Sequence, residues 1–250
     1  MASPAKRSIL VINPNTTRAM TNGLKPLIDS LGYTDDELEV IYYTAPAGVP
    51  SINNEDDAAI SARECLTELS TSSYLNDCQG FLVCCYSQHP LVPALRSLIA
   101  ERNMHGKAVT GIFEASVASC LQSLNVHDKF GIVSTGKQWE EILGDAVTNL
   151  LGSASSSRYA GTETTGLNAV ELHTTPKEEV DKRMKNATKR LLDKKARAIC
   201  LGCAGMAGMD KTVREACIEH LGEEEGNRIK IVDGVISGIL HLQGALRASN

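Results

Sequence analysis

The stretch Ala198-Ile-Cys-Leu-Gly-Cys-Ala-Gly-Met206 determines how we interpret the rest of the chain. Its first residues are apolar and predict the end of a buried strand, so that Cys203 lies on the turn that leaves the strand. Gly205 follows two residues later, and a residue without a side chain allows backbone amides to approach a ligand closely. Cys203 is therefore a candidate for chemistry rather than for packing.

A second stretch repeats this arrangement earlier in the chain. Gly80-Phe-Leu-Val-Cys-Cys-Tyr-Ser-Gln-His-Pro90 again runs from an apolar strand through cysteine into a polar turn. Ligands of open α/β sheets bind outside the carboxyl ends of the strands, which is where both cysteine motifs fall. We therefore expect one cleft with a thiol on each wall. Such a cleft suits the movement of a proton from one face of a carbon to the other.

Strand-like and helix-like runs alternate outward from these two stretches. This alternation predicts βαβ crossovers and parallel sheets, and hence an α/β fold. The expected strands span residues 8–12, 38–43, 79–85, 107–112, 129–133, 198–202 and 228–232. Residues 152–166 are rich in Ser, Thr and Gly and predict a loop, with at most a short strand near Tyr159.

The spacing of the polar turns indicates an internal duplication. The turn at Asn13 precedes Cys85 by 72 positions (85 − 13), and the turn at Ser134 precedes Cys203 by 69 (203 − 134). A near-constant period of this kind is typical of repeated units. The two halves show no detectable residue-by-residue similarity, so the duplication is inferred from the period alone.

The predicted lobe boundaries follow from the point where the pattern restarts. Lys129 begins a new strand, and one strand at residues 228–232 is left over at the end of the chain. We expect a first α/β lobe formed by residues 1–112 and 223–250, and a second formed by residues 113–222. The C-terminal helix would then return to the first lobe.

Composition excludes several classes of partner. The 250 residues carry a net charge of −5, 42% hydrophobic and 22% charged residues, and only 4% aromatics. An acidic chain with few stacking rings does not fit nucleic acid or an anionic membrane surface. Residues 1–7 have no apolar run of signal-peptide length, so we expect a cytoplasmic protein whose eight cysteines are reduced. A homo-oligomer that acts on a small molecule, without metal or organic cofactor, is the expected form.

Most cysteines in proteins are small buried hydrophobes, and six of the eight here fit that description. They lie within or beside predicted helices or inside predicted strands: Cys65, Cys78, Cys120, Cys217, Cys84 and Cys200. Cys85 and Cys203 differ, because each ends a strand and precedes a turn of small or polar residues. Amides of a helix N-terminus at such a turn would lower the thiol pKa and supply some thiolate.

Other chemistry of these cysteines is less well supported. Cys200 and Cys203 have the spacing of a redox motif, but that motif opens a helix, whereas Cys200 is predicted inside a strand. A zinc site that joins them to Cys84, Cys85 and His89 lacks the usual second spaced pair.

The turn at Asn13, Asn15 and Thr16 has two interpretations. These side chains fit the capping of the helix that follows. Their amides and hydroxyl equally fit the binding of a carboxylate or a cyclic amide at the helix N-terminus.

Four motifs together resemble one protein family. They are Ile-Asn-Pro-Asn-Thr-Thr at 12–17, Val-Pro-Ser-Ile at 49–52, Cys-Tyr-Ser-Gln-His-Pro at 85–90 and Leu-Gly-Cys-Ala-Gly-Met at 201–206. In this order they are similar to the Asp/Glu/hydantoin racemase superfamily, in particular to its hydantoin and allantoin racemase branch with its fungal members. One departure is Gln88, which stands where the family often has Asp, and an amide cannot act as a base.

The resemblance implies two similar Rossmann-like lobes with parallel sheets, related by a pseudo-twofold axis, with the active site between them. It implies cofactor-independent racemisation by two cysteines, which correspond to Cys85 and Cys203. The substrate contacts that it implies fall on Asn13, Asn15, Ser51, Ile52, Tyr86, Ser87, Ser134, Thr135, Ala204 and Gly205.

The residues and the resemblance agree on inversion at a carbon next to a carbonyl. One thiolate would remove the proton and the opposite thiol would protonate the other face. A site of amides and hydroxyls favours a cyclic ureide such as a 5-substituted hydantoin or allantoin. The alternatives are an Asp/Glu-type racemase, a related decarboxylase or isomerase, and a catalytically silent protein that binds a small ureide.

Overall fold

The computed structural model describes residues 7–34 and 36–248. The question of an export signal at residues 1–7 therefore lies outside the described residues, except for Arg7. Among the described helices, none is both long and apolar enough to pass through a membrane.

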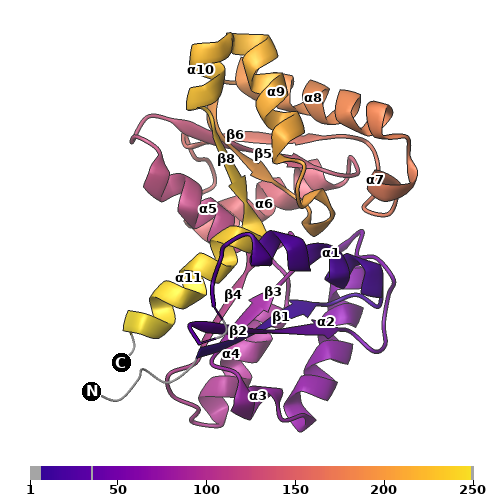
Figure 1. Cartoon of the computed structure of the whole chain (residues 1–250), viewed down its shortest axis with the longest axis vertical. Coiled ribbons are helices and arrows are strands. Elements are labelled where there is room, and N and C mark those ends of the chain that lie inside the picture. The colour runs from indigo at the N-terminus through magenta and orange to yellow at the C-terminus, as the bar shows by residue number, and fades with distance from the viewer. Residues whose placement is uncertain (1–6, 35, 249–250) are drawn as a thin grey trace. The chain divides into compact units, whose positions relative to one another are not determined.

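The first sheet has four parallel strands in the order β2-β1-β3-β4 (Figure 1). They are β1 (Arg7–Asn13), β2 (Leu38–Thr44), β3 (Gly80–Val83) and β4 (Ala108–Gly111). The helices of this half are α1 (Arg18–Asp29), α2 (Glu55–Thr71), α3 (Tyr74–Asp77) and α4 (Leu91–Glu101). The central strands are continuous apolar runs buried on both faces, as parallel sheets require.

The second sheet has the same order, β6-β5-β7-β8, and its strands are also parallel. They are β5 (Lys129–Ser134), β6 (Tyr159–Thr164), β7 (Ala196–Leu201) and β8 (Lys230–Asp233). The remaining helices are α5 (Ile112–Ser123), α6 (Trp139–Leu151), α7 (Glu171–Thr174), α8 (Lys177–Asp193), η1 (Ala204–Met206), α9 (Asp210–Leu221), α10 (Glu223–Arg228) and α11 (Gly234–Ala248). The expected α/β fold with two parallel sheets is confirmed.

The chain divides into two compact units. The first contains the chain up to Cys85, His89–Ile112 and the chain from Gly238 on; the second contains Tyr86–Gln88 and Phe113–Ser237. The expected placement of residues 223–237 in the first lobe is wrong. Strand β8 pairs with β7, so that Leu201 lies beside Asp233 in the second sheet. The chain returns to the first unit only within α11.

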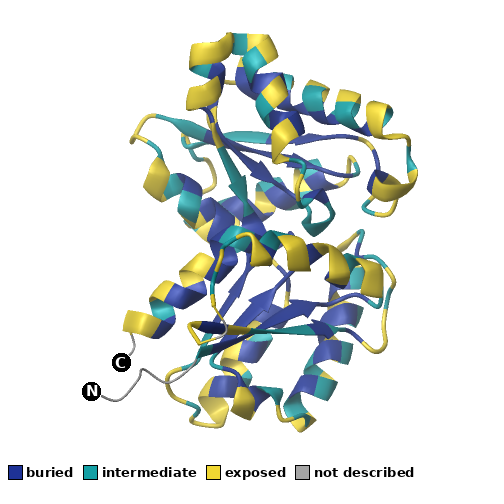
Figure 2. Ribbon diagram, viewed as in Figure 1, coloured by how far each residue is buried: buried dark blue, intermediate teal, exposed yellow. Residues whose placement is uncertain are grey.

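The core of the first unit lies on both faces of its sheet, where Figure 2 shows buried strands beneath helices with exposed outer surfaces. One face packs against α2 and α4 through residues such as Phe81 and Leu95. The other face receives α11 at very short range. A Cβ on Gly238 of α11 would lie 2.3 Å from Cδ1 of Leu82, so only glycine lets the helix approach this strand.

The second unit has its main apolar cluster between the sheet and α8 and α9, with Met184 and Val213 fully buried. Helix α5 contributes to the same unit from the other side. Cys120 of α5 and Cys200 of β7 are fully buried, and their sulfur atoms lie 3.3 Å apart. These two cysteines therefore pack in the core, as expected from the sequence.

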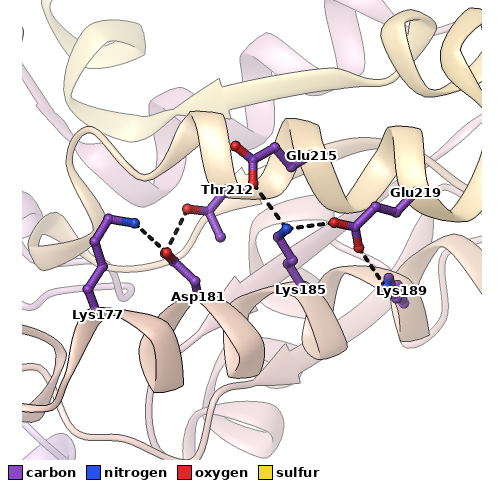
Figure 3. Close-up of polar contacts among 7 residues, drawn as sticks. All are labelled: Lys177, Asp181, Lys185, Lys189, Thr212, Glu215 and Glu219. Carbon is purple, nitrogen blue, oxygen red and sulfur yellow. Dashed lines mark hydrogen bonds and ion pairs between the residues drawn. The ribbon is translucent and has the colours of Figure 1, made fainter.

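Helices α8 and α9 are also joined on their solvent side by ionic contacts (Figure 3). Lys185 pairs with Glu215 at 3.0 Å and with Glu219 at 2.6 Å, and Glu219 also pairs with Lys189 at 2.9 Å. At the N-terminal end, Thr212 donates to Asp181 at 2.9 Å. Exposed ion pairs contribute little singly, so the buried cluster beneath them supplies most of the stability of this helix pair.

Candidate functional site

Each candidate cysteine occupies the same place in its own sheet. Strand β3 ends at Val83 and Cys85 is the second residue beyond it; β7 ends at Leu201 and Cys203 is the second residue beyond it. Val83 and Leu201 are themselves equivalent, since β3 and β7 hold the same position in the two strand orders. The expected strand ends, two residues later in β3 and one later in β7, are wrong.

A backbone hydrogen bond fixes the residue before each cysteine. The amide of Cys84 donates to the carbonyl of Ile12 in β1 at 2.8 Å. In the second unit, the amide of Gly202 donates to the carbonyl of Val133 in β5 at 2.7 Å. Cys84 is buried, whereas Cys85 is partly exposed. This register favours Cys85 over Cys84 as the residue that meets a ligand.

The environment of Cys203 corrects one expectation about its acidity. The amide of Gly205 donates to the Cys203 sulfur at 3.3 Å. Burial nevertheless raises the pKa of the Cys203 thiol to about 11, although the amides of Gly205 and Met206 lower it. The sequence predicted that such amides would leave some thiolate; the structure shows that burial outweighs them. At neutral pH Cys203 is therefore a thiol, which suits a proton donor.

Ser134 and Thr135, at the end of β5, are both bonded to neighbouring turns of the second unit. Both are buried. The Ser134 hydroxyl donates to the carbonyl of Gly202 at 2.9 Å, and the Thr135 carbonyl accepts from the amide of Gly166 at 2.9 Å. Ser134 thus holds the backbone just before the cysteine, whereas Thr135 holds the loop that follows β6.

Asn13 and Asn15 are buried and bonded within their own turn. The Asn13 amide nitrogen donates to Asn15 Oδ1 at 3.1 Å and to Thr21 Oγ1 at 3.0 Å. Asn15 Oδ1 in turn accepts from the amide of Thr17, the N-cap of α1, at 2.9 Å. These hydrogen bonds order the turn that leads into α1, although the N-cap residue Thr17 itself makes no side-chain cap.

The loop with Ser51 and Ile52 is bonded to this same turn. The amide of Thr16 donates to the carbonyl of Val49 at 3.0 Å, and the Thr17 hydroxyl donates to the carbonyl of Pro50 at 2.7 Å. Ser51 is partly exposed and Ile52 is buried. The structure therefore brings these two predicted site segments of the first unit together.

Tyr86 and Ser87, which follow Cys85, are buried. The Tyr86 hydroxyl lies 2.7 Å from the Ser116 hydroxyl, and its ring meets Phe113 edge-on at 5.7 Å. Burial raises the pKa of the Tyr86 phenol well above its usual range. The Tyr86 side chain is thus a packing group of the second unit, and only its backbone remains a candidate contact.

Gln88, which stands where the family often has Asp, is exposed and accepts from the Asn149 side chain at 3.4 Å. Its neighbour His89 is fully buried. His89 Nδ1 accepts from the amide of Leu91 at 3.2 Å, while Nε2 finds no hydrogen-bond partner in the structure. His89 is therefore held as the neutral imidazole at the start of α4.

The burial of His89 predicts acid-sensitive stability. Burial lowers the pKa of His89 to about 4, against about 6.5 in the unfolded chain. Its contribution is therefore fully present above pH 6.5 and is lost as the pH falls towards 4, by roughly 3 kcal/mol. We expect His89→Asn, which retains an acceptor for the Leu91 amide, to flatten this part of the stability profile. Urea titrations between pH 4 and 7 measure it, with the exposed His105→Gln as control; equal slopes in all three proteins would refute the expectation.

The structure adds one residue that the sequence did not single out. A Cβ placed on Gly205 would lie 3.3 Å from Nε2 of His173 and 3.5 Å from the sulfur of Cys203. His173 belongs to α7, which packs against η1. Both side chains thus lie beside Gly205, which has no side chain of its own. No motif links His173 to this turn in the sequence, because its position depends on how α7 packs against η1.

Comparisons with known proteins agree with this architecture. The description of the Asp/Glu/Hydantoin racemase family matches residues 9–242, so the chain belongs to this family of isomerases. The resemblance inferred from the four motifs is confirmed.

The chain is also similar to individual proteins. It is 34% identical to an uncharacterized protein of Schizosaccharomyces pombe over 96% of this chain and 92% of that one. It is 27% identical to a hydantoin racemase of Pseudomonas sp., over 92% of this chain and 82% of the relative. The solved allantoin racemase of Klebsiella pneumoniae has a TM-score of 0.74 and 25% identity, over 97% and 88% of the two chains.

Proposed function

We propose that this protein racemises a cyclic ureide, a 5-substituted hydantoin or an allantoin-like compound, without a cofactor, with Cys85 and Cys203 as its two acid–base groups. The observation that carries the proposal is the equivalent placement of the two thiols, each two residues beyond an equivalent strand. Membership of the racemase family and the named hydantoin and allantoin racemase relatives support it.

The proposed reaction moves one proton in each direction. The Cys85 thiolate takes the proton from the carbon next to the carbonyl, and an S–H bond forms as the C–H bond breaks. The resulting enolate takes a proton from the Cys203 thiol on its opposite face, which leaves Cys203 as the thiolate. A high pKa at Cys203 keeps that proton in place until the enolate is present. The reverse substrate uses the same groups with exchanged roles.

A neutral substrate fits the turns that carry the cysteines. Residues 13–17, 84–90, 134–136 and 202–206 contain no lysine or arginine. Lysine and arginine make the strongest hydrogen bonds to carboxylates, so their absence from these turns makes an amino-acid dicarboxylate the less favoured substrate. A cyclic ureide needs only amides, hydroxyls and carbonyls, which these turns contain.

The proposal is tested by incubating the protein with single enantiomers of 5-substituted hydantoins, of allantoin, and of aspartate and glutamate. Circular dichroism follows the loss of optical activity, and mass spectrometry follows deuterium uptake from D2O. We expect both signals with a ureide and neither with the amino acids, and no loss of rate after treatment with a chelator. Racemisation of glutamate or aspartate alone would show that the protein is an amino-acid racemase instead. Binding of a ureide with no deuterium uptake would indicate a silent binding protein.

A further inference from the structure

We propose that Cys120 and Cys200 form an oxidisable pair of thiols, which hydrogen peroxide converts into a disulfide that fastens α5 to β7 and stabilises the second unit. Both cysteines lie in that unit, and both carry free thiols in the structure, so the observed state is the reduced one. The proposed racemisation uses neither residue. The inference therefore adds a site of oxidation to the proposed function and can be tested without turnover.

The two sulfur atoms already lie close together. Cys120 and Cys200 are 80 positions apart in the sequence, yet their sulfur atoms are 3.3 Å apart. An S–S bond is about 2.05 Å long, so the sulfurs need to approach by about 1.3 Å. Strand β7 is paired on both sides, with Cys200 beside Ile132 of β5 and Val232 of β8. The approach is therefore made by side-chain rotation and a small movement of α5 rather than by the sheet.

This pair differs from the one that the sequence spacing suggested. Cys200 and Cys203 are three positions apart, but the Cys203 sulfur accepts from the amide of Gly205 at 3.3 Å, beyond the end of β7. The thiol that meets Cys200 comes instead from α5. A disulfide between Cys120 and Cys200 would leave the Cys203 thiol unmodified.

Polar groups gather around the Cys200 sulfur. The hydrogen bond from the Cys120 thiol lowers the pKa of Cys200 against the opposing effect of burial. The hydroxyls of Tyr86 and Ser116, which are 2.7 Å apart, lower this pKa further. The hydrogen bond between the two thiols, together with burial, raises the pKa of Cys120. Because the thiolate is the reactive form in sulfur oxidation, we expect Cys200 to react first and Cys120 to close the disulfide.

The oxidation balances with one molecule of hydrogen peroxide. The Cys200 thiolate attacks one peroxide oxygen, so that an S–O bond forms, the O–O bond breaks and hydroxide leaves, which takes up the thiol proton and becomes water. The Cys120 sulfur then attacks the resulting sulfenic acid. The S–S bond forms, the S–O bond breaks and a second water leaves with the Cys120 proton. The two sulfurs lose two electrons and the peroxide oxygens gain them.

Burial determines which oxidants reach this pair. Cys120 and Cys200 are both fully buried. Buried cysteines are as a rule inert, because reagents do not reach them and apolar surroundings suppress the thiolate. Hydrogen peroxide is little larger than water and can enter during local openings of the fold. The hydrogen bonds to Cys200 supply the second requirement, a stabilised thiolate.

The first test maps the cross-link in wild-type protein. Native protein is treated with hydrogen peroxide, free thiols are then blocked with iodoacetamide in urea, and the unreduced digest is analysed by mass spectrometry. We expect a peptide pair joined through Cys120 and Cys200 as the main cross-link, which dithiothreitol reverses. Cys217 is the internal control, because it is equally buried but lies on α9 in the apolar cluster, and it should be recovered in alkylated form.

Two results of this mapping would overturn the proposal. One is the recovery of Cys120 and Cys200 as alkylated thiols at a peroxide dose that oxidises the partly exposed Cys85. The other is the same set of cross-links in protein that was oxidised in urea, since the native geometry would then play no part.

The second test asks whether the bond stabilises the fold. A disulfide that closes so long a loop restricts the unfolded chain, so peroxide should raise the Tm of the wild type by about 10 °C, and dithiothreitol should reverse the rise. Cys120→Ala, treated in the same way, should show no rise. An unchanged or lower Tm in the cross-linked wild type, or a rise in Cys120→Ala, would contradict the proposal. The mapping of the cross-link needs no variant, so it decides the proposal even if Cys120→Ala does not fold.

Discussion

Cys85→Ser and Cys203→Ser are each expected to abolish racemisation, with a fall in kcat/KM of at least about 100-fold, the usual effect of losing a general acid or base. A serine hydroxyl is too weak an acid to act as a base at neutral pH. Each variant nevertheless keeps one thiol. It should still exchange the α-proton of one enantiomer with solvent, and the two variants should prefer opposite enantiomers. Deuterium incorporation into each pure enantiomer measures this.

The neighbouring cysteines provide matched controls. Cys84 and Cys200 are both buried, and Cys200 lies in β7 with its sulfur against that of Cys120. Serine is smaller and more strongly hydrated than cysteine, so its burial costs more and fills the space less well. We therefore expect Cys84→Ser and Cys200→Ser to lose about 1–3 kcal/mol of stability and to keep their chemistry. An inactive Cys84→Ser beside an active Cys85→Ser would move the reactive position by one residue. Full activity in both Cys85→Ser and Cys203→Ser would refute the two-thiol mechanism.

Gly202→Ala should damage stability and activity together. A Cβ on Gly202 would lie 2.6 Å from the carbonyl oxygen of Val133 and 2.6 Å from Cγ2 of Ile132. A backbone oxygen cannot rotate away, so the turn itself must shift. We expect a loss of about 1–3 kcal/mol in the free energy of unfolding, as in other overpacked cores. Because Cys203 is the next residue, we also expect kcat to fall by about 100-fold, the effect of a displacement near 1 Å.

The control for this variant is Gly144→Ala on α6, where a Cβ would meet nothing within 4 Å. Thermal unfolding and kcat are measured on both proteins. If Gly202→Ala matches the wild type in thermal unfolding and in kcat, the tight packing of this turn contributes to neither stability nor catalysis. A loss of stability with unchanged kcat would show that Cys203 tolerates movement of its turn.

Local sequence patterns were sufficient to predict most of the fold. Apolar runs such as Ile9–Ile12 are buried whatever surrounds them, and their alternation with helices predicts parallel sheets. Strand β6 was expected mainly as loop, since residues 152–166 are rich in Ser, Thr and Gly. Its strand form comes from pairing with β5, a contact distant in the sequence. The prediction that β8 belongs to the first lobe was wrong for the same reason, because hydropathy does not indicate which strand pairs with it.

The candidate site was predictable in position but not in chemistry. The motifs placed Cys85 and Cys203 near the ends of strands, because glycine and polar residues mark turns locally, although the exact last residue of each strand was not predicted correctly. The acidity of Cys203 depends on how much protein surrounds the sulfur, which no local pattern contains. The contact of His173 with the same turn likewise arises only when α7 packs against η1.

The division of the chain has a consequence for how the protein is made. A ribosome releases β1 to β4 long before it reaches Gly238, yet α11 completes the first unit by packing on Leu82. Domains often fold during synthesis, starting from the N-terminus. Here the nascent first unit must wait with one apolar face uncovered until the ribosome has translated nearly the whole message. A stop codon just before α11 would therefore release a chain that presents this face to chaperones and proteases.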